Sequence, residues 1–156
     1  ETVNLAELVE NVVSAHSLPA RAKMMHTELL LSERLCEAEP ALLVSVLDNL
    51  YSNAVHYGAE SGNIRIHSYR HGEQVRIDVI NDGEPIPPAE RNMIFEPFYQ
   101  GSHQRKGAVK GSGLGLSIAR DCVRQMQGEL SLVDDKSGLI CFRITLPVAE
   151  SGQNNV

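Results

Sequence analysis

Polar side chains form a stripe along a segment that otherwise has the spacing of a buried helix. In residues 40–57, apolar residues recur with a period near 3.6 and predict a core-facing stripe of Leu43, Val46, Leu47, Leu50 and Ala54. A second stripe is polar and consists of Asp48, Asn49, Ser52, Asn53 and His56. A solvated helix face explains most stripes of this kind. Asparagine is a poor helix former, however, and amide oxygens four residues apart suit a Mg²⁺ ion that carries phosphates and water.

Two further segments combine turn-forming residues and glycines. Residues 81–87 read Asn-Asp-Gly-Glu-Pro-Ile-Pro after a candidate strand, so both an ordinary turn and a ligand pocket remain open. Residues 111–116 read Gly-Ser-Gly-Leu-Gly-Leu and begin a helical pattern, where free backbone N–H groups can hold phosphate. Glycines also serve loops and close packing. The second segment is neither a dinucleotide fingerprint, since no strand immediately precedes it, nor a P-loop, since it lacks the Gly-Lys-Ser/Thr end.

The rest of the chain predicts the elements that position these segments. Periodicity predicts helices over 5–15, 40–57 and 114–127, and strands over 26–31, 63–70, 73–80, 129–133 and 139–146. Residues 98–113 lack periodicity, are rich in glycine and basic residues, and are expected to form a mobile lid. The predicted fold class is an α/β (α+β) two-layer sandwich, in which about three helices cover one face of a mixed, largely antiparallel sheet. The other face of the sheet should be exposed.

Composition limits the classes of protein to consider. With 156 residues, of which 42% are hydrophobic, we expect one domain over 1–149 and a disordered polar tail over 150–156. The net charge of −6 argues against a nucleic-acid partner. Cys36, Cys122 and Cys141 lie far apart in apolar stretches, as expected for buried thiols in a reducing compartment. No apolar run approaches the roughly 20 residues needed to cross a bilayer. Because the chain begins at Glu1, we expect a piece of a longer protein, with membrane or dimerisation parts upstream.

Four segments together resemble the N, G1, F and G2 boxes of histidine kinases in order and spacing. They are 47–54 (LDNLYSNA), 81–87 (NDGEPIP), 95–99 (FEPFY) and 111–116 (GSGLGL). The chain thus resembles the ATP-binding catalytic domain of a bacterial sensor histidine kinase. The resemblance implies the Bergerat-type ATP-binding fold, which gyrase, the Hsp90 chaperones and the MutL proteins share. It also implies ATP and Mg²⁺ as cofactors.

The resemblance implies a set of nucleotide-binding residues, with Asn53 as the Mg²⁺ ligand and no assigned catalytic side chain. Departures from the family pattern are His56 for a frequent Lys, Asn81 for the adenine-reading Asp, Pro85 for the second glycine, and Gln100 for a frequent Arg. Other residues must then neutralise the phosphate charge, and the basic residues of the lid are candidates. These residues could equally belong to a solvated basic loop that binds no phosphate. The expected set is Asn49, Asn53, His56, Tyr57, Asn81, Asp82, Gly83, Ile86, Arg105, Lys106, Lys110, Gly111, Ser112, Gly113, Leu114, Gly115 and Leu116.

The residue at position 49 distinguishes ATP hydrolysis from phosphate transfer to a protein. In related ATPases a Glu at this position activates water, and the amide of Asn49 cannot act as that base. Transfer of phosphate to a histidine is therefore favoured, with a histidine-bearing dimerisation domain and a response regulator as partners. None of the six histidines here has the family's acceptor setting, so the acceptor should lie outside this chain. The resemblance implies the cytoplasmic domain of an inner-membrane sensor. Two alternatives are a hydrolase of the gyrase and chaperone class and a regulatory module that has lost nucleotide binding.

Overall fold

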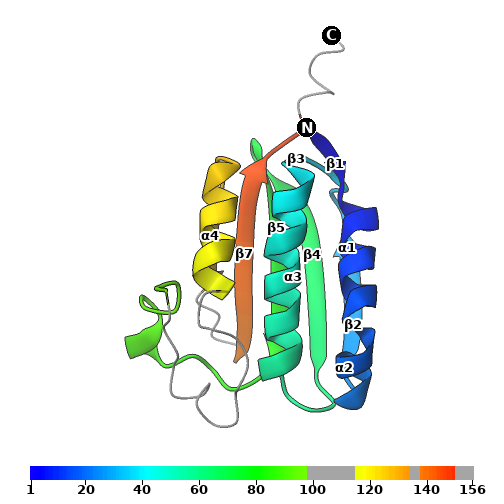
Figure 1. Ribbon diagram of the computed structural model, residues 1–156, viewed down its shortest axis with the longest axis vertical. Helices are drawn as coiled ribbons and strands as arrows, with labels where there is room; N and C mark the ends of the chain where they lie inside the picture. The colour runs from blue at the N-terminus through cyan, green and yellow to red at the C-terminus, as the bar shows by residue number, and fades with distance from the viewer. Residues whose placement is uncertain (98–114, 134–137, 150–156) are drawn as a thin grey trace.

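A five-stranded sheet forms the back layer of the molecule (Figure 1). The computed structural model describes residues 1–97, 115–133 and 138–149. The strand order is β2-β4-β5-β7-β6, where β2 and β4 are parallel and the other neighbours antiparallel. The strands are β2 (His26–Leu31), β4 (Asn63–His71), β5 (Gln74–Asp82), β6 (Glu129–Val133) and β7 (Leu139–Pro147). A mixed, mostly antiparallel sheet is thereby confirmed.

Three longer helices lie side by side on one face of this sheet, with α3 in the middle (Figure 1). The helices are α1 (Leu5–Ala15), α2 (Ser17–Ala22), α3 (Pro40–Tyr57) and α4 (Gly115–Gln125). Helix α1 begins where the Asn4 side chain accepts a hydrogen bond from the Glu7 N–H, and α3 has Pro40 in its first turn. No helix in the described parts of the chain has both the length and the apolar character needed to span a membrane.

The core lies between the sheet and α3. All five residues of the predicted apolar stripe of α3 are at most 3% exposed. They pack against alternate strand residues, which are also buried: Ile64, Ile66, Val75, Ile77, Val79, Ile140, Phe142, Ile144 and Leu146. Alternation along β5 therefore assigns Val79 and Asn81 to the helix-covered face.

The face of the sheet away from the helices carries an internal ion pair. Asp78 in β5 is only 5% exposed, and its two oxygens accept hydrogen bonds from the Arg143 guanidinium at 2.9 and 3.1 Å. The Tyr69 hydroxyl also donates to Asp78, at 3.0 Å. These contacts compensate the buried carboxylate. They also raise the pKa of Arg143, chiefly through the hydrogen bonds to Asp78.

Several short elements were not predicted from the sequence. Strands β1 (Thr2–Asn4) and β3 (Leu35–Glu37) form a separate antiparallel pair, and the 3₁₀ helix η1 spans Pro88–Glu90. Helix α2 was also missed. Three residues show no alternation to identify a strand, and the six residues of α2 are fewer than two helical turns, so neither gives a clear periodic signal.

Strand β5 is longer than predicted. Asn81 pairs with Ile64 and Ile140, and Asp82 pairs with Leu139, so both residues belong to the strand. The predicted strand ends at residue 80, which would leave Asp82 to begin a turn. This prediction is wrong, because the neighbouring strands β4 and β7 continue the ladder to this end. The turn before β5 has two residues, as predicted, but it is shifted by one residue to Gly72 and Glu73, with Gly72 at a φ of 64°.

Candidate functional site

A small, mostly apolar pocket opens where α3, α4 and the ends of β5 and β7 meet. It encloses about 360 Å³ of space, including the part open to solvent. Its lining comes from five segments of the chain: Asn53, Tyr57, Asn81, Ile86, Ile94, Leu116, Ile140 and Phe142. An apolar slot with a few amide groups can hold a flat aromatic ring that has a polar edge. Five of these eight residues belong to the set expected from the sequence.

Asn81 is the buried polar group of the pocket. Its side chain sits in a residue only 4% exposed, and its Nδ2 donates to the backbone oxygen of Asp82 at 2.9 Å. This bond uses one N–H of the amide, and Oδ1 is the hydrogen-bond acceptor that the side chain offers. In this orientation the amide offers what a carboxylate would offer, namely a hydrogen-bond acceptor, but without its charge.

Asp82 has a structural role in this arrangement. Its Oδ2 accepts a hydrogen bond from the backbone N–H of Asn63 at 2.9 Å, and its backbone oxygen accepts from Ala59 at 3.0 Å. The carboxylate therefore ties the end of β5 to the start of β4. Asp82 does not line the pocket, whereas its neighbour Asn81 does.

Gly83 allows β5 to approach the C-terminal end of α3. It forms an isolated antiparallel bridge with Gly58. A Cβ atom added at Gly83 would lie 3.1 Å from the Tyr57 backbone oxygen and 3.2 Å from Asn81 Nδ2, which is tighter than most real contacts. Glycine thus favours close packing here, next to two pocket residues, Tyr57 and Asn81.

The two asparagines of α3 lie between the pocket and the start of α4. Asn53 is half-buried and lines the pocket. An ideal Cβ on Gly115 would lie 3.4 Å from Asn49 Oδ1, so Asn49 sits beside the first turn of α4. Leu116 reaches the pocket from that same turn. Residues 111–114 and the basic residues Arg105, Lys106 and Lys110 fall outside the described residues.

His56 and Tyr57 end α3 with different exposures. Their rings contact edge to face, with centroids 4.3 Å apart. Tyr57 is half-buried in the pocket wall, and burial raises the pKa of its phenol, which therefore stays neutral at physiological pH. His56 is exposed and is not among the pocket-lining residues.

The segment before residue 98 is held against the pocket by an aromatic contact. Phe95 packs edge to face on Phe142, with ring centroids 6.1 Å apart, and the Arg120 guanidinium carbon lies 4.5 Å above the Phe95 ring. Phe142 lines the pocket, so this contact links the wall of the pocket to α4. Ile94 and Ile140 were missed from the sequence, because buried apolar residues give no signal that distinguishes a pocket from a core.

Comparison with known families identifies the class of protein to which this fold belongs. The profile of the family described as "Histidine kinase-, DNA gyrase B-, and HSP90-like ATPase" matches residues 38–150. The chain belongs to this family.

Among its relatives are sensor histidine kinases. Over 151 residues the chain is 72% identical to the sensor histidine kinase GlrK of Escherichia coli strain K12, a match that covers 97% of this chain and 32% of GlrK. The chain thus spans about a third of that relative.

Solved structures of histidine kinases share the fold. The catalytic domain of ThkA superposes with a TM-score of 0.82 at 28% identity, over 95% of this chain and 97% of that one. ThkA in complex with the response regulator TrrA gives a TM-score of 0.78 at 26% identity, covering 96% and 42%. Full-length ShkA in complex with AMPPNP gives 0.80 at 26% identity, covering 96% and 31%. The chain has the fold of a histidine kinase catalytic domain.

Proposed function

We propose that this chain binds Mg-ATP in the pocket beside α3 and transfers the γ-phosphoryl group to a histidine of a separate dimerisation domain. The observation that carries the proposal is the buried Asn81 amide, which lines an apolar slot and whose Nδ2 is bonded to the Asp82 backbone oxygen, so that Oδ1 is the acceptor it offers. The adenine 6-amino group is a donor on the edge of a flat ring. Adenine therefore matches the pocket in apolar character and hydrogen-bond polarity.

The triphosphate would extend from the adenine toward Asn53, Asn49 and the start of α4. The positive end of a helix and its free N–H groups favour phosphate. Asn53 lines the pocket and Asn49 lies about one turn away beside Gly115, so amide oxygens border this path. Such neutral oxygens fit a Mg²⁺ ion that keeps several waters and binds mainly through phosphates. Asn53 would hold this ion, which, when bound, neutralises charge on the phosphates.

Of the remaining residues expected from the sequence, Tyr57, Gly83 and Ile86 would form the adenine end of the site. His56 lies in the last turn of α3, outside the pocket lining, and its contact with the nucleotide remains a prediction. Arg105, Lys106, Lys110 and the segment Gly111 to Leu114 remain predictions for binding the phosphates, and Gly115 and Leu116 continue that segment into α4. Asp82 would act indirectly, by holding the end of β5.

In this reaction the chain would contribute mainly the positioning of ATP. The bond from the γ-phosphorus to the β,γ-bridging oxygen breaks and a phosphorus–nitrogen bond forms with the acceptor imidazole. ADP leaves, and the imidazole N–H proton is released. Asn49 has no group that could deprotonate water, which favours a protein acceptor over hydrolysis. The chain would therefore orient ATP and exclude water, while the acceptor comes from another domain.

Partners and location follow from the family. The relative ThkA forms a complex with the response regulator TrrA, which supports a response regulator as the downstream partner. Because GlrK is about three times longer than this chain, the parent protein would carry a histidine-bearing dimerisation domain. The parent would be an inner-membrane sensor, with this domain in the cytoplasm.

A titration of ATP by isothermal calorimetry, with and without Mg²⁺, tests the proposal. Saturable 1:1 binding that tightens with Mg²⁺ is expected, and GTP should bind more weakly because its 6-oxo group would face the Asn81 acceptor. Absence of nucleotide binding would favour the alternative of a regulatory module. Release of phosphate from ATP by the chain alone, at rates typical of an ATPase, would favour the hydrolase.

A further inference from the structure

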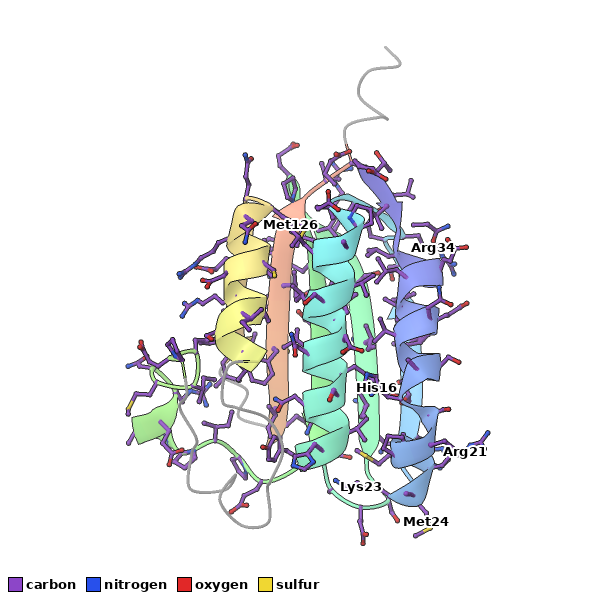
Figure 2. All side chains as sticks on the ribbon, in the orientation of Figure 1. His16, Arg21, Lys23, Met24, Arg34 and Met126 are labelled. Carbon is purple, nitrogen blue, oxygen red and sulfur yellow. The ribbon has the colours of Figure 1, made fainter. Side chains whose placement is uncertain are left out.

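One lysine, Lys23, binds the C-terminal end of α3. Lys23 follows α2, and its Nζ donates to three backbone oxygens: those of Val55 at 2.8 Å, His56 at 3.0 Å and Gly58 at 2.7 Å. Figure 2 shows Lys23 next to the lower end of α3. An ammonium group has three N–H donors, and all three have a carbonyl within hydrogen-bond distance.

The carbonyls that Lys23 binds are those that a helix leaves without intrahelical partners. The last four oxygens of a helix lack N–H donors, and they carry the negative end of its dipole. An ammonium group at this end donates hydrogen bonds to these oxygens, and its positive charge offsets the negative end of the dipole. Partial burial lowers the pKa of Lys23, yet a lysine whose ordinary value is about 10.4 remains protonated at neutral pH.

The same stretch of α3 forms part of the nucleotide pocket. Tyr57, which lies between the bound carbonyls of His56 and Gly58, lines the pocket. Gly58 bridges to Gly83, and the next residue, Ala59, donates to the Asp82 oxygen that Asn81 also binds. The end of α3 is thus connected by hydrogen bonds to the end of β5, where the proposed adenine acceptor lies.

A second contact between the region of Lys23 and the end of α3 limits the movement of this segment. The Lys23 backbone oxygen accepts a hydrogen bond from the Ser61 N–H at 2.8 Å, and the terminal methyl of Met25 lies beside Gly58. Residues 23–25 therefore contact both sides of the turn that leaves α3. The Lys23 side chain binds the end of α3, and the Lys23 backbone oxygen binds the turn that follows.

From these contacts we infer that Lys23 is a positioning residue for the nucleotide site, which it controls by fixing residues 55–58 of α3. This inference rests on the proposed function, because it concerns the adenine end of that pocket. Lys23 itself is not among the residues that line the pocket. It acts through Tyr57 and through the Gly58–Gly83 bridge, and therefore on the base rather than on the phosphates.

The test is Lys23→Met, which keeps an unbranched side chain and removes the charge and the donors. If the ordered end of α3 is then populated only about a fifth of the time, the Kd for ATP rises about fivefold. The factor should be the same for ADP and in the absence of Mg²⁺, since the perturbation lies at the base. Amide hydrogen exchange at Gly58 and Ala59 should accelerate in the same variant.

Two further variants separate positioning from general stability. Lys23→Arg keeps a cation and several donors, so it should restore most of the affinity. Arg21→Met removes an equal charge from the exposed side of α2, where Figure 2 shows Arg21 pointing away from α3, and should leave Kd unchanged. Both binding and exchange are measured at a temperature where every variant is fully folded.

The outcomes are distinguishable. If the wild-type chain binds ATP and Lys23→Met lowers the melting temperature but leaves the Kd of the folded protein unchanged, Lys23 is only structural and the inference is overturned. A loss confined to ATP with Mg²⁺, with ADP unaffected, would also overturn it, because the effect would then lie at the phosphates. If the wild-type chain binds no ATP, the proposed function fails and this inference fails with it.

Discussion

Replacing Asn81 by alanine should weaken ATP binding while leaving the fold intact. The Asn81→Ala change removes the proposed acceptor, and the adenine amino group would be buried without a partner. An unsatisfied buried donor costs about 1–3 kcal/mol, which corresponds to about 5- to 150-fold in Kd. The Asp82 oxygen loses its bond from Asn81 Nδ2 but keeps the one from Ala59, so the free energy of unfolding should fall by only about 1 kcal/mol.

The assay compares two ligands in calorimetric titrations. Purine riboside triphosphate lacks the 6-amino group, so the wild-type chain should bind it more weakly than ATP. Asn81→Ala should lose this preference and bind purine riboside triphosphate at least as tightly as ATP, because the variant offers the 6-amino group no acceptor. The double-mutant cycle isolates this single contact. The comparison is Asp82→Ala, which should lower stability through the lost bond to Asn63 and weaken ATP binding less than Asn81→Ala does. Loss of ATP binding in Asp82→Ala but not in Asn81→Ala would refute the assignment.

Three further predictions concern the metal, the packing and a thiol. Asn53→Ala should abolish most of the effect of Mg²⁺ on the Kd for ATP, and an unchanged Mg²⁺ dependence in titrations would remove Asn53 from the site. Gly128→Ala should lower the free energy of unfolding in urea by about 3 kcal/mol or more, because the added Cβ would lie 2.0 Å from the Thr145 oxygen; an unaltered midpoint would contradict this close approach. Burial raises the pKa of Cys36 to about 12, so its thiol should resist a disulfide reagent at pH 8 until the chain unfolds. The unfolded thiol ionises above about pH 8.5, so this group's contribution to stability should decrease as the pH rises through that value.

Helix α3 could be predicted from the sequence because its signals are local. Pro40 at its start, Gly58 after its end and the apolar period between them fix both its bounds and its buried face. The neighbouring polar stripe then follows from geometry. The position of Asn81 on the inner face of β5 was predictable in the same way, since alternation from Val79 is a property of any strand.

The rest of the pocket depends on contacts between distant segments. Ile94, Ile140 and Phe142 come from parts of the chain far from α3, and their apolar character predicts burial but not a pocket. The separate roles of Asn81 and Asp82 depend on how β4 begins beside β5, which no local pattern determines. The contacts of Lys23 span more than 30 residues of sequence, so its role is visible only in the folded chain.

The most direct test of the central claim is a phosphoryl-transfer assay with γ-labelled ATP. The chain is incubated with labelled ATP and Mg²⁺, alone and together with the separately prepared histidine-bearing dimerisation domain of its parent protein. Label should appear only on the added domain and should be acid-labile, as phosphohistidine is. Transfer should be slow, since without a covalent link the effective concentration of the acceptor is low. Acid-labile label on the isolated chain, or none on the added domain under conditions where ATP binds, would contradict the account.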